Sequence, residues 1–214
     1  MNKDTLNLHL EILNKERQEV LEKLLFLAKD FVLGGGTALA LQLNHRKSFD
    51  FDFFSSSSIP KNLLEKITKI IPVENIAIDT SDELTFFTKD AIKLTFLFYP
   101  FVRTYPIIRS DYGLSLFPIK EIAIQKAYTI GRRGEYRDYY DLYFILNNNY
   151  IDLKEIISEA KKVYEGAFDE KIFLQQLVYF GDISNFNITP VSNNTLLTPD
   201  DVKRYFEDLV KSFV

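Results

Sequence analysis

The chain has 214 residues, of which 46% are hydrophobic, and a formal net charge of -4. This length and apolar content predict a folded protein with a real core rather than a disordered one. Because the net charge is negative, the molecule as a whole has no electrostatic attraction for nucleic acid, so any site for a polyanion must be local. The absence of cysteine excludes disulfides and thiolate metal sites, and two histidines exclude a histidine-rich metal site. No apolar run reaches the ~20 residues of a membrane helix, and the N-terminus shows no secretory pattern, so we expect a cytoplasmic protein with no membrane partner.

The first half of the chain predicts a mixed sheet. Leucines and a valine at three- and four-residue steps predict one amphipathic helix over residues 4–29, capped by Asp4 or Thr5. Residues 31–54 then read as a strand, a glycine turn, a short helix and a second strand. Further on we expect a helix over 61–71 with Pro60 at its first position, strands over 73–79, 84–88 and 91–99 with a hairpin turn at Lys89-Asp90, and strand or irregular segments over 101–108 and 112–116.

The pattern changes to helical periodicity at Phe117-Pro118. Helices are predicted over 119–130, 136–146, 153–164, 170–179 and 199–213, with a long polar loop over 182–197. The predicted fold class is α+β (α/β): a mixed sheet with flanking helices, followed by an all-helical C-terminal half. The predicted domains are residues 1–117 and 118–214.

Two features of segment 31–54 predict a phosphate and metal site. Glycines in Gly34-Gly35-Gly36-Thr37, between a strand and a helix, let the backbone approach a ligand, and the helix N-terminus offers N–H groups to a phosphate. The alternative is a merely tight turn. Asp50 and Asp52 alternate with phenylalanines, so both carboxylates share one face of the strand, where they suit Mg²⁺ bound together with substrate phosphates.

The alternative for the aspartates is that one is exposed and the other pairs with Arg46 or Lys47. The combination of glycine turn and aspartates is more specific than either part. His45, Arg46 and Lys47 precede the carboxylates, where they could meet a triphosphate.

The second candidate group lies in the helical half. Lys126 is the only charge in an apolar run, and Asp138 and Asp141 share a helical face. One interpretation is that Lys126 neutralises nucleotide phosphate while an aspartate orients it or accepts a proton. The other is that Asp138 caps a helix or pairs with Arg133 or Arg137, and ties two helices together. Three tyrosines nearby are either core or a platform for a base: Tyr136, Tyr139 and Tyr140.

These motifs resemble the AbiEii/AbiGii toxin family of nucleotidyltransferases. The first motif is Gly35-Gly36-Thr37-Ala-Leu-Ala-Leu, then His45-Arg46, then Asp50-Phe-Asp52-Phe-Phe. The second runs from Lys126 through Arg132-Arg133 to Arg137-Asp138-Tyr-Tyr-Asp141-Leu-Tyr. The resemblance covers roughly residues 30 to 147.

The resemblance implies a minimal nucleotidyltransferase sheet with a helical C-terminal half. It implies a toxin of a toxin–antitoxin or abortive-infection system, which uses Mg²⁺ and a nucleoside triphosphate and adds nucleotides to an RNA such as tRNA or to a protein hydroxyl. A cognate antitoxin is then an expected partner. Carried over by position, Gly35, Gly36, Thr37 and Arg46 bind the triphosphate, Asp50 and Asp52 hold the metal, and Lys126, Asp141 and Asp138 complete the catalytic set.

The sequence departs from this fold's usual pattern at one strand. Many such enzymes carry a third carboxylate on a neighbouring strand, yet in 91–98 the polar face offers Lys93, Thr95 and Leu97. Lys93 is therefore predicted to contact phosphate. Other acidic residues would need a different register to serve: Asp79, Asp82, Glu83 and Asp90. Nucleotide binding without transfer, or a role through a protein partner, stays open as an alternative.

Overall fold

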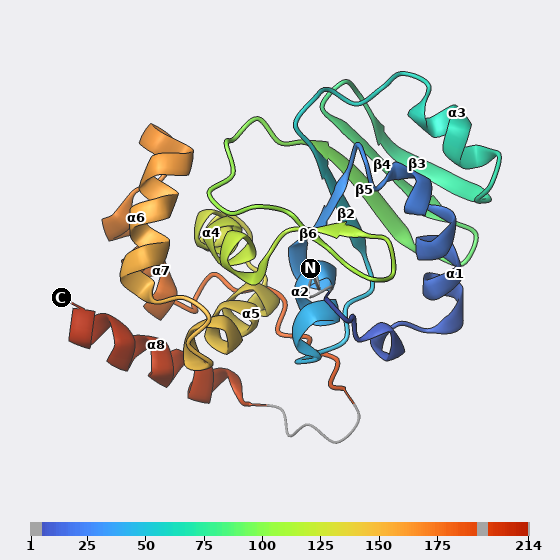
Figure 1. Cartoon of the computed structure of the whole chain (residues 1–214). Helices are drawn as coiled ribbons and strands as arrows, with labels where there is room; N and C mark the ends of the chain where they lie inside the picture. The colour runs from blue at the N-terminus through green and yellow to red at the C-terminus, as the bar shows by residue number, and fades with distance from the viewer. Residues whose placement is uncertain (1–5, 192–196, 214) are drawn as a thin grey trace, which may run out of the picture. The chain divides into compact units, whose positions relative to one another are not determined.

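The computed structural model describes residues 6–191 and 197–213, which form two compact units (Figure 1). The first unit reaches to Phe101 and takes in Pro106–Pro118. The second contains Val102–Tyr105 and the chain from Ile119 onward. The short segment 102–105 thus belongs to the helical unit although its flanks belong to the sheet. That the two units are separate folding domains stays a prediction.

A seven-stranded mixed sheet forms the first unit, in the order β3-β4-β5-β2-β1-β7-β6. Its strands are β1 (Val32–Gly34), β2 (Phe51–Ser55), β3 (Val73–Asp79), β4 (Glu83–Thr88), β5 (Lys93–Phe98), β6 (Ile108–Arg109) and β7 (Ser115–Leu116). β2 runs antiparallel to β1 and parallel to β5, so the sheet is mixed as predicted. The predicted strand over 91–99 therefore lies directly beside the strand that carries Asp52.

Alternation along β2 buries phenylalanine on one side of the sheet. Phe51 and Phe53 are buried, and Phe53 stacks on Phe96 of β5 at 5.1 Å between ring centroids. Helices α1 (Lys15–Lys23) and α3 (Leu63–Thr68) lie to the same side of strands β3–β5 in Figure 1. Phe49, the phenylalanine before Asp50, does not follow this pattern. It precedes the strand and is 42% exposed, with the Arg17 guanidinium 5.0 Å from its ring.

The prediction of one helix over residues 4–29 is wrong for the part that the structure describes. The chain instead forms two 3-10 turns, Leu10–Ile12 and Leu25–Leu27, on either side of α1. Asn14 caps α1 by accepting a hydrogen bond from the Arg17 N–H at 3.1 Å. Gln18 donates to the carbonyls of Leu10 and Leu13, which continuous helix would have used for backbone bonds. The predicted caps Asp4 and Thr5 lie outside the described residues.

The helix predicted over 61–71 is shorter than expected. α3 begins at Leu63, so Pro60 lies before the helix rather than at its first position. The Leu63 N–H donates to the Pro60 carbonyl, which makes the entry a turn. The hairpin at Lys89-Asp90 is confirmed, and Ala91 closes it at φ 55°.

Helices alone make up the regular structure of the described second unit. They are α4 (Ile119–Thr129), α5 (Tyr136–Asn147), α6 (Leu153–Tyr164), α7 (Glu170–Val178) and α8 (Pro199–Phe213), with a 3-10 turn at Glu165–Ala167. α4 packs against α5 and α6, while α8 packs against α5 and α7. The predicted helical half is confirmed, and its helix bounds differ from the predicted ones by one residue at most.

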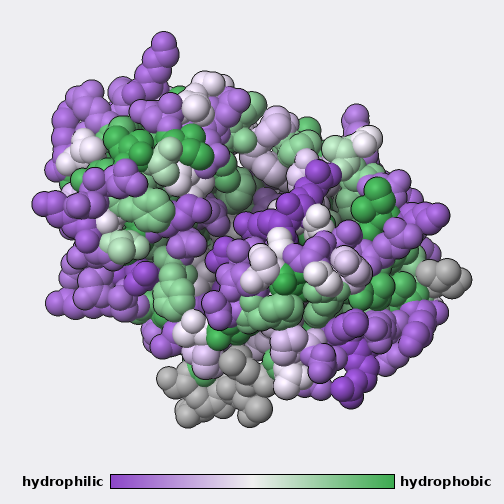
Figure 2. Space-filling model, turned by 180° about the vertical axis from the view of Figure 1, so that it is seen from behind, coloured by the Kyte–Doolittle hydropathy of each residue, from purple (hydrophilic) through white to green (hydrophobic). Residues whose placement is uncertain are grey.

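Apolar side chains reach the surface in separate groups. Figure 2 shows green patches divided by hydrophilic side chains on the face that it draws. Exposed apolar residues such as Val102 (83%) and Ile172 (58%) come from different elements, as is usual for folded proteins. Within the described residues, no helix is long and apolar enough to cross a membrane.

Replacing the capping residue of α1 tests its role. Asn14→Ala removes the acceptor for the Arg17 N–H, so the free energy of unfolding should fall by about 1 kcal/mol. The measurement is denaturant unfolding followed by circular dichroism. Asn62→Ala is the matched control, because Asn62 precedes α3 without a capping side-chain hydrogen bond among the described residues. An equal loss in both variants would contradict the assignment of Asn14 as a cap.

Candidate functional site

The glycine turn, residues Gly34–Thr37, joins β1 directly to helix α2 (Gly35–Leu43). Gly35 has φ +62°, a left-handed conformation that a side chain rarely adopts. A Cβ at Gly35 would lie 2.6 Å from Asp52 Oδ2. The Asp52 carboxylate therefore sits against the first residue of α2, where N–H groups without helical partners and the positive dipole end favour negative charge.

Arg46 and Ser48 lie against Gly36 of the turn. Arg46 is buried, and its Nη1 donates to the Lys47 carbonyl. Its Nη2 would lie in close contact with a Cβ at Gly36. Thr37 is also buried, and its hydroxyl is hydrogen-bonded to Ser48 Oγ at 2.8 Å and to the Asp50 carbonyl. In the described structure, Arg46 and Thr37 thus hold the turn and the approach to β2 together. Ser48 had no signal in the sequence, because a lone serine in a polar segment predicts nothing specific.

The sheet register places Asp52 in a row with two neighbours. Gly34 of β1 pairs with Asp52 on one side, and Thr95 of β5 pairs with it on the other. Continued by one residue, the parallel register puts Asp50 beside Lys93. Both aspartates are half-buried, and Asp50 lies just before β2 rather than in it.

The donor set suits a divalent cation that binds together with substrate. No group of three or more His, Cys, Asp or Glu in the described residues could hold a metal alone. Mg²⁺, however, commonly takes one or two carboxylates and fills its other positions with water and phosphate oxygens. A phosphate on the α2 N-terminus would repel the adjacent Asp52 carboxylate unless a cation lay between them. Asp50 and Asp52 could therefore hold Mg²⁺ in the presence of a nucleotide.

The second predicted group forms an ion-pair cluster within the helical unit, in which Lys126, Asp138 and Asp141 are buried and Arg133 is half-exposed. Lys126 Nζ lies 2.6 Å from both Asp138 Oδ1 and Asp141 Oδ2. Arg133 Nε donates to Asp138 Oδ2 at 2.7 Å and Arg133 Nη2 to Oδ1 at 2.9 Å. The structural interpretation of Asp138 thus describes it correctly, with Arg133 as the partner, and the cluster ties α4 to α5.

Opposing effects set the ionisation of Asp138. Burial favours its neutral form, but the charge of Lys126 and the Arg133 hydrogen bond outweigh burial and hold the pKa of the carboxyl below its ordinary value. The ion pairs of the cluster thus join two cations to two carboxylates. That Lys126, Asp138 and Asp141 take part in catalysis stays a prediction.

The tyrosines of α5 belong to the core. Tyr136, Tyr139 and Tyr140 are each 1% exposed. Tyr139 packs against Phe180 at 4.8 Å between ring centroids and donates a hydrogen bond to the Gln176 carbonyl. The alternative in which these rings stack on a base is therefore wrong, since their faces are covered by other aromatic residues.

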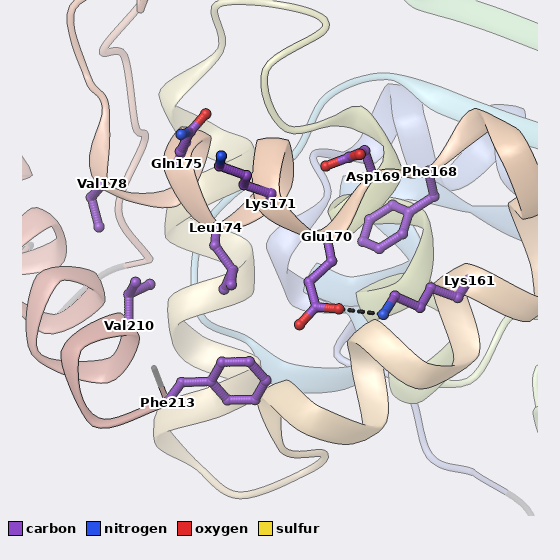
Figure 3. A pocket seen from close by; sticks show the side chains of 10 residues that line it. All are labelled: Lys161, Phe168, Asp169, Glu170, Lys171, Leu174, Gln175, Val178, Val210 and Phe213. Atoms are coloured by element: carbon purple, nitrogen blue, oxygen red, sulfur yellow. Dashed lines mark hydrogen bonds and ion pairs between the residues drawn. The ribbon is translucent and has the colours of Figure 1, made fainter.

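An open pocket of about 760 Å³ lies among α6, α7 and α8 (Figure 3). Leu174, Val178, Val210 and Phe213 form its apolar wall, and an ion pair between Lys161 and Glu170 borders it. The residues lining this pocket, as the structure describes it, include none of the predicted site residues. The pocket therefore adds no support to the predicted nucleotide site.

Comparison with known proteins assigns the chain to a family. A family model described as "Nucleotidyl transferase AbiEii toxin, Type IV TA system" matches residues 19–212. The chain belongs to the AbiEii nucleotidyltransferase toxin family. A curated relative, protein aq_aa25 of Aquifex aeolicus (strain VF5), is 36% identical to this chain over 178 residues, or 79% of this chain and 84% of that protein.

Solved structures support the AbiEii fold. MenT4, a nucleotidyltransferase toxin from Mycobacterium tuberculosis H37Rv, matches with a TM-score of 0.61 and 16% identity, covering 91% of this chain and 80% of that one. JHP933 from Helicobacter pylori matches with a TM-score of 0.56 and 19% identity over 94% and 91% of the two chains. At these identities the likeness shows a shared fold, which confirms the predicted sheet with a helical half.

Substitution of Gly35 tests the contact between the glycine turn and Asp52. Gly35→Ala adds a Cβ in left-handed backbone against Asp52 Oδ2, so the free energy of unfolding should fall by about 1–3 kcal/mol. Denaturant titration measures this loss. Gly166→Ala is the control, because no described atom lies within 4 Å of a Cβ there, and it should change stability by less than about 0.5 kcal/mol. A harmless Gly35→Ala would contradict the close contact.

Neutralising Asp138 tests the ion-pair cluster. Asp138→Asn leaves the buried Lys126 ammonium with one carboxylate, so the free energy of unfolding should fall by about 3–5 kcal/mol at neutral pH. The pKa of Asp138 is lowered, so its contribution is present above its ordinary value of 3.8 and is lost as pH falls through the lowered pKa. Thermal melts between pH 2 and 7 should therefore converge for the two proteins at the acid end.

Asp208→Asn is the matched control for Asp138→Asn. Asp208 forms an exposed pair with Lys211 at 3.8 Å, and such pairs contribute little. A constant offset between wild type and Asp138→Asn down to the lowest pH would show that lost charge is not the cause.

Proposed function

We propose that this protein is a Mg²⁺-dependent nucleotidyltransferase that transfers a nucleoside monophosphate from a nucleoside triphosphate to a hydroxyl of RNA or protein. The observation that carries the proposal is the Asp52 carboxylate against Gly35, which joins a cation ligand to a phosphate-binding helix N-terminus. The AbiEii family match supports the same reaction class.

Each candidate site residue of the first unit has a role in this proposal. The N–H groups of Gly35 and Gly36 bind phosphate oxygens, and Lys93 adds positive charge from the neighbouring strand. Asp50 and Asp52 would hold Mg²⁺, which when bound neutralises phosphate charge and lowers the pKa of a coordinated hydroxyl. Arg46 and Thr37 act indirectly, because they are buried and keep the turn in shape.

The reaction is an in-line displacement at the α-phosphorus. The acceptor hydroxyl oxygen forms a bond to phosphorus, the bond to the bridging oxygen of the β-phosphate breaks, pyrophosphate leaves, and the hydroxyl proton passes to a base. Binding that aligns hydroxyl and phosphate supplies much of the rate increase in such transfers. A tRNA 3′ end is the acceptor that we propose to test first.

Labelled nucleotides test transfer directly. Wild type is incubated with each of the four α-labelled nucleoside triphosphates, Mg²⁺ and total tRNA, and label in RNA and in protein is measured. Asp50→Ala should lower transfer by at least about 100-fold if this carboxylate holds the metal. Asp90→Ala, an exposed residue in the turn between β4 and β5, should leave transfer unchanged. No label transfer from any nucleotide by wild type would count against the enzyme.

A second candidate function is nucleotide binding without transfer. Thr95, not a carboxylate, lies beside Asp52 in the sheet register, which favours binding over activation of an attacking hydroxyl. Calorimetry would separate the two functions, since a binding protein shows nucleotide affinity with no pyrophosphate release. The toxin–antitoxin family also supports an antitoxin as partner, and an antitoxin gene beside the gene for this chain would agree with that role.

A further inference from the structure

Three polar side chains form a hydrogen-bonded row that ends beside Asp52. Glu83 and Thr85 lie on β4, Thr95 lies on β5, and the sheet register pairs Thr85 with Thr95 and Thr95 with Asp52. Thr85 Oγ1 lies 2.6 Å from Glu83 Oε1 and 3.3 Å from Thr95 Oγ1. β4, β5 and β2 lie next to one another in Figure 1. The row therefore connects an acidic residue to the neighbour of Asp52 within one unit.

The carboxylate sets the direction of these hydrogen bonds. A hydroxyl carries one proton, and an ionised carboxylate accepts hydrogen bonds but donates none. Thr85 must therefore donate its proton to Glu83. The Thr85 oxygen is then left to accept, so Thr95 donates its own proton to Thr85. As a result, Thr95 Oγ1 has only lone pairs to offer to anything other than Thr85.

Burial keeps the hydrogen bonds of the row in this direction. Thr85 and Thr95 are 4% and 5% exposed, so water has little access to rearrange their protons, and buried hydroxyls keep the partners that the protein provides. On the Asp52 side, a lone-pair oxygen thus lies beside a carboxylate. A threonine hydroxyl in this state is a Mg²⁺ ligand in other phosphoryl-transfer proteins.

We propose that Thr95 Oγ1 is the third protein oxygen of the metal site, and that Glu83, through Thr85, is the positioning residue that turns its lone pairs toward Asp52. This inference rests on the proposed function, because it concerns the same cation. It assigns a neutral ligand to the strand where no carboxylate is present. Glu83 acts without touching the metal.

Mn²⁺ binding to the full chain tests the proposal without relying on turnover. Mn²⁺ replaces Mg²⁺ as the probe and is added together with a nucleoside triphosphate, with a nucleotide-only blank. Unbound Mn²⁺ is measured by electron paramagnetic resonance, and water-proton relaxation reports how many waters the bound ion holds. Thr95→Val should weaken binding about tenfold and add one bound water. Thr95→Ser keeps the hydroxyl and should stay close to wild type.

Glu83→Gln tests the direction of the hydrogen bonds. The glutamine amide can donate a hydrogen bond to the Thr85 oxygen. Thr85 can then donate its own proton to Thr95, so that Thr95 no longer has to donate to Thr85. Binding should weaken about tenfold, although Glu83→Gln removes no metal ligand. Thr88→Val is the control: it repeats the Thr95→Val substitution at a buried threonine of β4, the strand of Glu83, whose hydroxyl accepts from the Ile92 N–H. It should change Mn²⁺ affinity by less than about twofold.

The outcomes separate this inference from the proposed function. If wild type binds Mn²⁺ and Asp52→Ala does not, the metal site stands. Unchanged affinity and water number in Thr95→Val would then overturn the role of Thr95 alone. If wild type does not bind Mn²⁺ together with the nucleotide, or if Asp52→Ala binds it equally well, the metal site of the proposed function fails and the role of Thr95 fails with it. Should Thr95→Val not fold, Glu83→Gln and Thr95→Ser decide the question.

Discussion

The contact between the Asp52 carboxylate and the backbone of Gly35 is the constraint on which the first unit depends. It requires a strand that passes into a helix without a loop, and a residue without a side chain at that junction. The helix N-terminus stabilises the carboxylate. A phosphate bound at the same N-terminus would be repelled by the carboxylate unless a cation lay between them. Buried Arg46 and Thr37 hold the turn in this shape, so their polar groups serve the geometry of the site.

Charge is handled differently in the two units. In the first unit, carboxylates and threonine hydroxyls follow one another across neighbouring strands from Glu83 to Asp52. In the second, Lys126 and Arg133 pair with the carboxylates of Asp138 and Asp141. Such a cluster specifies how helices pack, because removing the Asp138 carboxylate leaves the buried Lys126 ammonium with one carboxylate fewer. Its geometry accounts for its presence without reference to catalysis.

Sequence periodicity predicted the helices of the second unit well and the N-terminal region poorly. α4 to α8 have long, regular apolar patterns, and packing against one another reinforces them. The leucines of residues 6–27 have the same spacing, but Asn14 caps α1 and Gln18 takes the carbonyls of Leu10 and Leu13. Side-chain hydrogen bonds of this kind compete with helix and leave no mark in hydrophobic periodicity.

The sequence by itself determined the two groups of candidate residues, the mixed sheet with a helical half, and the family. The elements and candidate groups follow from local spacing, because alternation in a strand and three- to four-residue steps in a helix depend only on neighbours in the chain. The family follows from the resemblance of the two motifs. Only the tertiary structure decided that Arg46 and Thr37 face inward, that tyrosines of α5 are core, and that Thr95 lies beside Asp52. Strand pairing and side-chain burial join residues far apart in sequence, so no local pattern specifies them.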